Sequence, residues 1–309
     1  MEKLVFSRKG FDSDSGYGYS PYDPATGKYV LLPIPEEKIS SQNIRYRDLM
    51  LKPDYLDIKG ISNLNDLVQT NSLAYSRKSQ NVAKSGFAHF DPMLGDCPWL
   101  DGAPNIGAFG QSEAAAGHLR INEVKTGSIF LFFSRFKPIS GRVHPFDPEA
   151  GWSKGIYYIY GWLKVGKVIT AVNYSELPQK VIDSFHPHST CDDFRYRKNN
   201  TIFLPAEKLF DGSEIPGYGY FPRLTNCLKL SSDFHKNIPS IWRLPSFFNE
   251  ELYRPTYLKN KKKSEQRWMI CEDKKNCFVQ TTGRGQEYIS KLDKKSSAWI
   301  KSLFKEECY

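Results

Sequence analysis

Six residues near the middle of the chain, Ser128-Ile129-Phe130-Leu131-Phe132-Phe133, are almost entirely apolar. A second apolar run follows at Ile156-Tyr157-Tyr158-Ile159-Tyr160-Gly161-Trp162-Leu163-Lys164-Val165-Gly166. Runs of this kind are typical of strands that are covered on both faces of a sheet. Residues 137–154 between them contain Pro, Gly, Arg and His, so we expect a long hairpin connection, and such loops often carry function.

Weaker patterns on either side of this pair predict the remaining elements. Short apolar segments indicate strands at residues 4–6, 28–35, 201–204 and 268–271. Helices are indicated from Asn65, over 111–122 and over 286–304, where strong helix formers or apolar residues at helical spacing occur. Because no repeat or clear linker divides the chain, we expect one α+β unit over residues 1–309, with a mixed, largely antiparallel sheet and peripheral helices.

The overall composition favours a polyanionic partner. The chain has 309 residues, 40% of them hydrophobic, and its 43 basic against 34 acidic side chains give a net charge of +9. Such a balance favours nucleic acid or nucleotides as partners. No window approaches the roughly 20 apolar residues of a membrane helix, and Met1–Leu4 lacks a signal-peptide core. We therefore expect a cytoplasmic protein that does not bind membranes.

The cysteine pattern argues against a structural metal. The six cysteines are scattered, at positions 97, 191, 227, 271, 277 and 308. The closest pair, Cys271 and Cys277, has no second pair to complete a zinc quartet. We expect reduced thiols.

The first strand runs into a loop rich in small and charged residues, Ser7-Arg8-Lys9-Gly10-Phe11-Asp12-Ser13-Asp14-Ser15-Gly16-Tyr17-Gly18. Glycines allow close backbone approach to a ligand, and successive N–H groups attract anions. Arg8 adds a planar fork that suits phosphate or carboxylate. A solvated hairpin turn is the equally weighted alternative, because Gly, Ser and Asp are ordinary turn residues.

Two histidine motifs could carry chemistry. In His89-Phe90-Asp91 the two polar groups share one face of an extended chain, which suits a general acid–base pair; a capped turn before Pro92 is the alternative. In His186-Pro187-His188 the two rings could bind a phosphate or chelate a metal. Because no convincing third ligand is visible, we expect no metal.

Further candidates lie near predicted helix ends. Gln111 precedes a helix start that supplies donors and a positive dipole, although capping by Ser112 would also explain it. His118 lies near the other end of that helix, and Arg135 follows the first apolar run. Gly283-Arg284-Gly285-Gln286-Glu287 joins a cation, an amide and a carboxylate. Tyr and Trp residues at 152–162 could stack bases or fill a core. Motifs of P-loop proteins, common kinases, zinc proteases and α/β-hydrolases are absent.

Together these motifs resemble a bacterial and phage family called nucleotide modification associated domain 3. The resemblance runs from about residue 3 to 290 and rests on these segments: 7–12, His89-Phe90-Asp91-Pro92, Phe109-Gly110-Gln111, 115–119, 131–133, 160–163, His186-Pro187-His188, Asn200-Thr201-Ile202 and Gly285-Gln286-Glu287-Tyr288. The chain departs from the pattern at Asp14, Tyr17 and Ser128. The resemblance implies a link to enzymes that modify bases in DNA, without defining a reaction.

A second resemblance is local. Residues 118–133 and 159–165 look like the central part of PUA-like barrels such as the EVE domain, which bind modified bases in an aromatic pocket. This resemblance implies a PUA-like barrel core over about residues 105–205 as the alternative to an open sheet.

Three hypotheses follow. The first is an enzyme that transfers or alters a group on a nucleobase or nucleotide, the second a non-catalytic reader of modified DNA, and the third a structural partner in a phage or defence complex. The first assigns catalytic roles to Asp12, His89, Asp91 and Glu287. It assigns ligand binding to Ser7, Arg8, Lys9, Gln111, His118, Arg135, His186, His188 and Gln286. Its partners would be nucleotide or DNA and other DNA-modification proteins; the sequence names no cofactor. It requires that these residues meet in one pocket.

Overall fold

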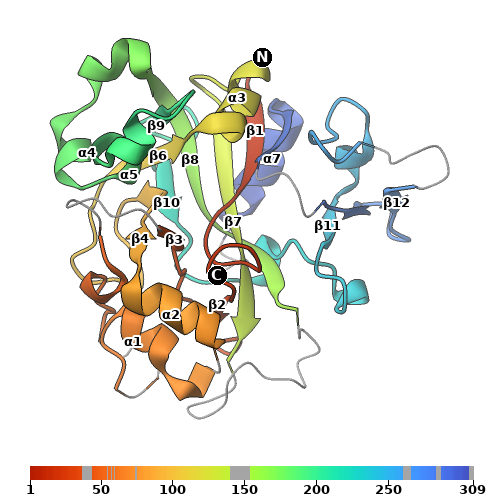
Figure 1. Cartoon of the computed structure of the whole chain (residues 1–309). Coiled ribbons are helices and arrows are strands. Elements are labelled where there is room, and N and C mark those ends of the chain that lie inside the picture. Colours follow the sequence, from red (N-terminus) through yellow and green to blue (C-terminus); the bar gives the residue numbers. More distant parts are fainter. Residues whose placement is uncertain are drawn as a thin grey trace.

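The computed structural model describes residues 1–36, 44–53, 55–56, 58, 60–73, 75–139, 154–259, 266–282 and 287–305. A mixed sheet forms the centre of the molecule, and helices lie around it (Figure 1). The sequence prediction of an α+β fold with a largely antiparallel sheet is confirmed.

The large sheet has the strand order β14-β1-β7-β8-β9-β6-β5, with β10 paired to β8 and β2 paired to β7. Its strands are β1 (Lys3–Arg8), β2 (Ser20–Tyr22), β5 (Met93–Leu94), β6 (Gly107–Gln111), β7 (Ile129–Pro138), β8 (Ile156–Thr170), β9 (Thr201–Pro205), β10 (Tyr218–Tyr220) and β14 (Glu287–Lys291). Two smaller sheets are formed by β3 (Ile34–Glu36) with β4 (Phe87–His89), and by β11 (Ile241–Pro245), β13 (Asn276–Gln280) and β12 (Trp268–Ile270).

The helices are short. They are α1 (Leu64–Gln69), α2 (Arg77–Ser85), α3 (Glu113–Ile121), α4 (Gln179–Asp183), α5 (Pro187–Thr190), α6 (Asp192–Arg195) and α7 (Lys294–Ser302). In Figure 1, α1 and α2 lie together at one end of the molecule, α3 lies near the other end, and α7 lies beside β1. The helix expected from Asn65 corresponds to α1, which Asn63 caps by accepting from the N–H of Asp66.

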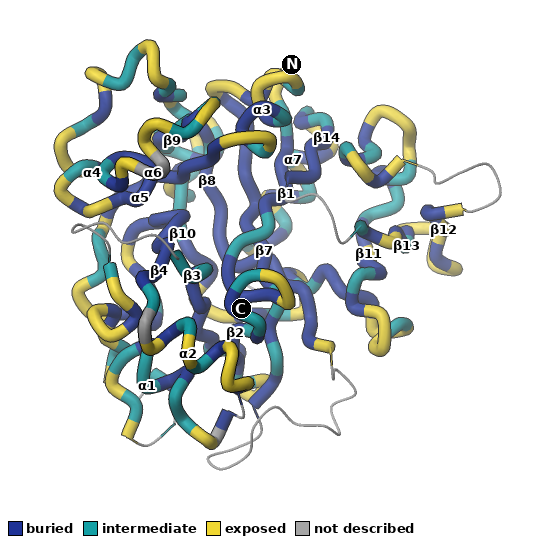
Figure 2. Tube along the Cα trace, in the orientation of Figure 1, coloured by how far each residue is buried: buried dark blue, intermediate teal, exposed yellow. Residues whose placement is uncertain are grey.

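The two apolar runs form β7 and β8 at the centre of the sheet, as predicted. Their pairing is antiparallel, from Ile129 opposite Lys164 to Phe136 opposite Ile156. The side chains of Phe130, Phe132 and Phe133 are at most 1% exposed. Figure 2 shows the same central strands as buried. Strands covered on both faces favour such uninterrupted apolar sequences.

Strand β1, near the start of the sequence, pairs with β14, near its end. It pairs in parallel with β7 and antiparallel with β14, and in the second ladder Ser7 is opposite Glu287. This pairing corrects the C-terminal prediction, because residues 287–291 form a strand and the helix begins only at Lys294. The apolar residues Tyr288 and Ile289 fit either structure locally, and the free edge of β1 decides between them.

Two other boundaries differ from the prediction. Gln111 ends strand β6, and α3 begins only at Glu113. Residues 28–35 were expected as a strand, but β3 covers only Ile34–Glu36, although Tyr29, Val30 and Leu32 are buried. Tyr29 forms only an isolated antiparallel bridge with Tyr22, so this buried apolar segment does not continue as a strand.

The barrel alternative is not confirmed. The described strands form an open order from β14 to β5 rather than a closed barrel. The aromatic rings of β8 pack in the interior: Tyr158, Tyr160 and Trp162 are at most 7% exposed. They therefore act as core residues. Trp152 lies outside the described residues.

Two further expectations concern the state of the cysteines and the lack of a membrane helix. Cys227 is disulfide-bonded, so the expectation of reduced thiols is wrong for this residue, whereas Cys97, Cys191, Cys271 and Cys277 are free. Among the helices of the described residues, none combines the length and apolar character needed to cross a bilayer.

Candidate functional site

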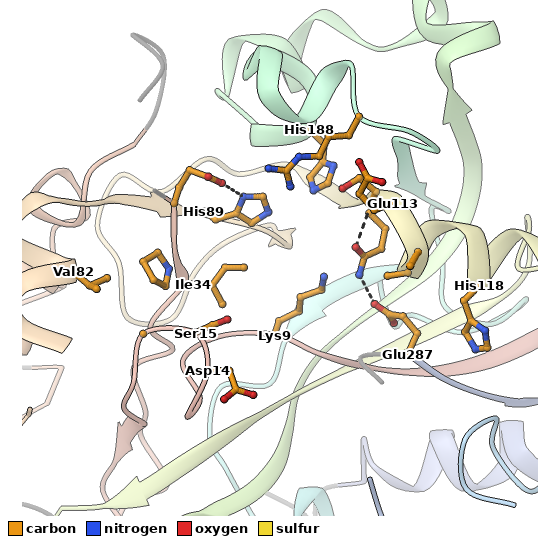
Figure 3. A pocket seen from close by; sticks show the side chains of 18 of the residues that line it. Lys9, Asp14, Ser15, Ile34, Val82, His89, Glu113, His118, His188 and Glu287 are labelled. Atoms are coloured by element: carbon orange, nitrogen blue, oxygen red, sulfur yellow. Dashed lines mark hydrogen bonds and ion pairs between the residues drawn. The ribbon is translucent and has the colours of Figure 1, made fainter. Parts of the chain in front are cut away.

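A cavity of about 730 Å³ lies where segments far apart in the sequence meet. The sequence-predicted residues in its wall are Lys9, Gln111, His118, His188, His89 and Glu287. They come from the end of β1, from β4, β6, α3, α5 and β14. Figure 3 shows Lys9, His89, His188 and Glu287 around the same space. The opening Ser-Arg-Lys segment therefore contributes to the same site as the histidine–aspartate motif.

Glu287 is the buried carboxyl group of this cavity. Ser7 Oγ and Gln111 Nε2 both donate to Glu287 Oε1, at 3.1 and 2.6 Å. The second oxygen, Oε2, is buried and has no hydrogen-bond partner among the described residues. Burial raises the pKa of Glu287 to about 7, although Lys9, Gln111 and Ser7 oppose this shift. A carboxyl group with this pKa can exchange a proton at neutral pH.

Asp91 lies between two histidines. Its Oδ1 accepts from the backbone N–H of Gly110 at 2.9 Å and lies 3.0 Å from Nε2 of His186. Its Oδ2 lies 3.8 Å from Nε2 of His89. Burial alone would raise the pKa of Asp91, but His186 and His89 outweigh it and hold that pKa well below its usual range. The lowered pKa favours the ionised form of Asp91 at neutral pH.

The outer nitrogens of His89 and His188 also have defined partners. His89 Nδ1 lies 3.4 Å from Glu36 Oε2. Burial lowers the pKa of His89, but the interactions with Asp91 and Glu36 outweigh burial and raise it overall. His188 Nδ1 lies 2.7 Å from Asn200 Oδ1, and burial holds the pKa of His188 well below its usual value.

The absence of a side chain at Gly110 lets the His188 ring pack against strand β6. A Cβ atom at position 110 would overlap the ring of His188, and the N–H of the same residue holds Asp91. Strand β6 therefore positions both groups through one residue without a side chain.

The cationic part of the wall consists of Lys9 and Arg197. Lys9 Nζ lies 4.5 Å from the centre of the Phe109 ring, and Figure 3 shows the lysine extending between His89 and Glu287. The N-terminal end of α3, with Ser112 and Ala114, borders the same space. Among the described residues, no first-turn N–H donates to the Ser112 hydroxyl, so side-chain capping does not explain this serine.

His118 also lines this cavity. Its Nε2 lies 3.0 Å from Thr256 Oγ1, and its ring packs on Tyr257 with centroids 4.6 Å apart. Burial lowers the pKa of His118.

Three predicted residues lie elsewhere. Arg8 and Asp12 form an ion pair at 3.2 Å, and Asp12 Oδ1 accepts from the N–H groups of Asp14 and Ser15. Arg8 and Arg135 line a different cavity of about 370 Å³. Arg135 also donates to Tyr19 Oη at 2.9 Å. Asp12 thus stabilises the loop, and the described wall of the larger cavity includes none of the three. Gln286 and Arg284 lie outside the described residues.

Sequence reasoning missed Glu36, Arg197 and Tyr257, which also line the larger cavity. Arg197 belongs to the basic segment Arg195-Tyr196-Arg197-Lys198, which could have indicated a cationic wall. Glu36 and Tyr257 carry no such signal, because neither belongs to a motif.

Comparisons with known proteins agree with the motif-based resemblance. The profile of the nucleotide modification associated domain 3 family matches residues 3–291, nearly the whole chain. Neither a search of curated proteins nor a search of solved structures found a significant match. The matched range includes every residue assigned above to the larger cavity. The chain belongs to the nucleotide modification associated domain 3 family.

Proposed function

We propose that this chain is an enzyme that alters or transfers a group on a nucleotide or on a base in DNA, and that the larger cavity is its active site. One observation carries the proposal: Lys9, His89, Gln111, His188 and Glu287, from five separate segments, line one cavity. Membership of a nucleotide modification associated family supports a nucleotide as the ligand.

Two cations in the wall suit the anionic end of a nucleotide, although the carboxyl groups of Asp14, Glu36, Glu113 and Glu287 line the same cavity. Lys9 and Arg197 supply positive charge, and Lys9 emerges from the end of a buried strand that fixes its position. The N-terminus of α3 borders the same space, and the positive end of its dipole favours phosphate there. These groups would hold the ligand and orient its reacting part toward Glu287.

Glu287 is the proposed general acid–base group. Its pKa of about 7 lets a large fraction of molecules hold or release a proton at neutral pH. Ser7 and Gln111 fix Oε1, so the buried Oε2 is the atom at which the proton would be held or released. This assignment replaces Asp12, which the Arg8 pair and the loop N–H groups occupy.

The reader hypothesis has less support. Tyr157, Tyr158, Tyr160 and Trp162 are at most 8% exposed. None of these four lines the larger cavity, and only Tyr157 lines the smaller one. A stacking pocket needs accessible ring faces. We therefore retain the enzyme as the proposed function.

The test is mass spectrometry of nucleosides from the DNA and nucleotide pool of cells that express the wild-type chain, the Glu287→Gln variant or neither. The proposal expects a modified nucleoside with the wild-type chain and its loss with the variant. Identical nucleoside profiles in all three samples, with both chains expressed and folded, would contradict it.

A further inference from the structure

Three buried side chains in and beside the cavity wall form a compact cluster. His89, Asp91 and His188 each offer a ligand atom, and these atoms lie within 4.8 Å of one another. The three residues are 5%, 6% and 2% exposed. Within the part of the chain that the structure describes, no other three His, Cys, Asp or Glu side chains come so close together.

The outer nitrogens of both histidines face polar partners. His89 Nδ1 lies 3.4 Å from a carboxylate oxygen of Glu36, and His188 Nδ1 lies 2.7 Å from the amide oxygen of Asn200. A ring nitrogen directed at such an acceptor carries the proton, which makes Nε2 the ligating atom. Metal-binding histidines are commonly oriented by a carboxylate or carbonyl oxygen in this way.

The two carboxylate oxygens of Asp91 also have different surroundings. Oδ1 is held by Gly110 N–H and His186 Nε2, whereas Oδ2 has no hydrogen-bond partner among the described residues and faces His89 Nε2 at 3.8 Å. The distance between His89 Nε2 and Asp91 Oδ2 is too long for a hydrogen bond, and a cation bound between the two atoms would neutralise the buried carboxylate.

We propose that His89 Nε2, Asp91 Oδ2 and His188 Nε2 bind one divalent first-row transition-metal ion. Imidazole with carboxylate is a donor set that Zn²⁺ and Fe²⁺ accept. Ligand atoms on one such ion lie about 3 to 3.5 Å apart, since each bond is about 2.1 Å long. His89 Nε2 and Asp91 Oδ2 lie 3.8 Å apart, which is close to this value, and small side-chain rotations would bring the two atoms to it.

The position of the cluster indicates a reactive rather than a purely structural site. His89 and His188 border the cavity, so an ion held by three protein atoms would keep coordination positions open to water or a ligand there. This proposal revises the sequence expectation of no metal, which lacked a third ligand beside His186 and His188. It does not depend on the proposed function.

The test is titration of the chelator-stripped full chain with Co²⁺, followed by its visible absorption and by metal analysis. We expect one Co²⁺ per chain, displacement by Zn²⁺ and no displacement by Mg²⁺, which prefers oxygen ligands. Asp91→Asn keeps the Oδ1 acceptor and removes only the charged Oδ2. It should weaken Co²⁺ binding by more than the ~100-fold that loss of an outer partner can cost. His118→Gln, which changes a histidine of the same cavity outside the cluster, should bind Co²⁺ as the wild type does.

X-ray absorption of the Zn²⁺-loaded wild type removes the dependence on variants. Two imidazoles and one further oxygen ligand from the protein are expected around the ion. Absence of bound Co²⁺ in the wild type, a zinc shell without imidazole, or equal Co²⁺ affinity of folded Asp91→Asn and wild type would each overturn the proposal.

Discussion

Gln111 Nε2 lies 2.6 Å from Oε1 of Glu287, although 176 positions separate the two residues in the chain. Glu287 begins β14 at one edge of the large sheet, whereas Gln111 ends β6, near the other end of the strand order. The carboxyl group of Glu287 is buried at this contact, where its protonation affects the stability of the fold.

Glu287→Gln should stabilise the protein relative to the wild type as pH rises. The folded pKa is about 7 against an ordinary 4.5, so the folded state binds more protons and the wild type loses stability as pH rises through this interval. Over this interval the wild type loses about 3 kcal/mol of unfolding free energy. The glutamine keeps the oxygen that Ser7 and Gln111 contact.

Thermal unfolding of both chains at pH 5 and pH 8 measures this effect. The melting temperature of the variant should rise relative to that of the wild type between the two values. Parallel pH profiles would show that Glu287 is already ionised in the folded protein at pH 5.

Gln111→Ala should raise the pKa of Glu287 further. The Gln111 amide donates to the ionised carboxylate and so lowers that pKa, as Ser7 and Lys9 also do. We expect the pH midpoint of any Glu287-dependent activity to lie near 7 in the wild type and higher in the variant. The pH profile of kcat checks this, and Gln80→Ala on α2 serves as a distant control. A midpoint that falls or stays unchanged would remove Gln111 from this role.

Gly110→Ala should be strongly destabilising. The new Cβ would overlap the His188 ring, and relieving such an overlap costs about 1–3 kcal/mol. Gly117→Ala in α3 is the matched control, because its Cβ would approach only the Asn199 side chain, at 3.3 Å, and alanine favours a helix by about 1 kcal/mol. Urea unfolding compares them, and equal stability of the two variants would contradict the packing described for His188.

The central strands and several residues that line the candidate cavity could be picked out from the sequence, because both leave local signals. The apolar runs at 128–133 and 156–166 indicated β7 and β8, and the motifs around His89, Gln111, His188 and Glu287 marked residues that share one cavity. The choice between strand and helix at 287–291 depends on pairing with β1, which no local pattern contains. Glu36 was missed for the same reason, since only the β3–β4 pairing brings it near His89.

Binding of a nucleotide in the cavity is tested most directly by calorimetric titration with deoxynucleoside monophosphates and a short single-stranded oligodeoxynucleotide. The wild type should bind at least one of these probes. Lys9→Gln should weaken that binding by about tenfold or more, corresponding to the ~1.5–3 kcal/mol of a hydrogen bond to a charged group. Lys84→Gln, at an exposed lysine on α2, should leave it unchanged. Failure of the wild type to bind any probe, or equal affinity of the Lys9→Gln and wild-type chains, would contradict the assignment of this cavity as a nucleotide site.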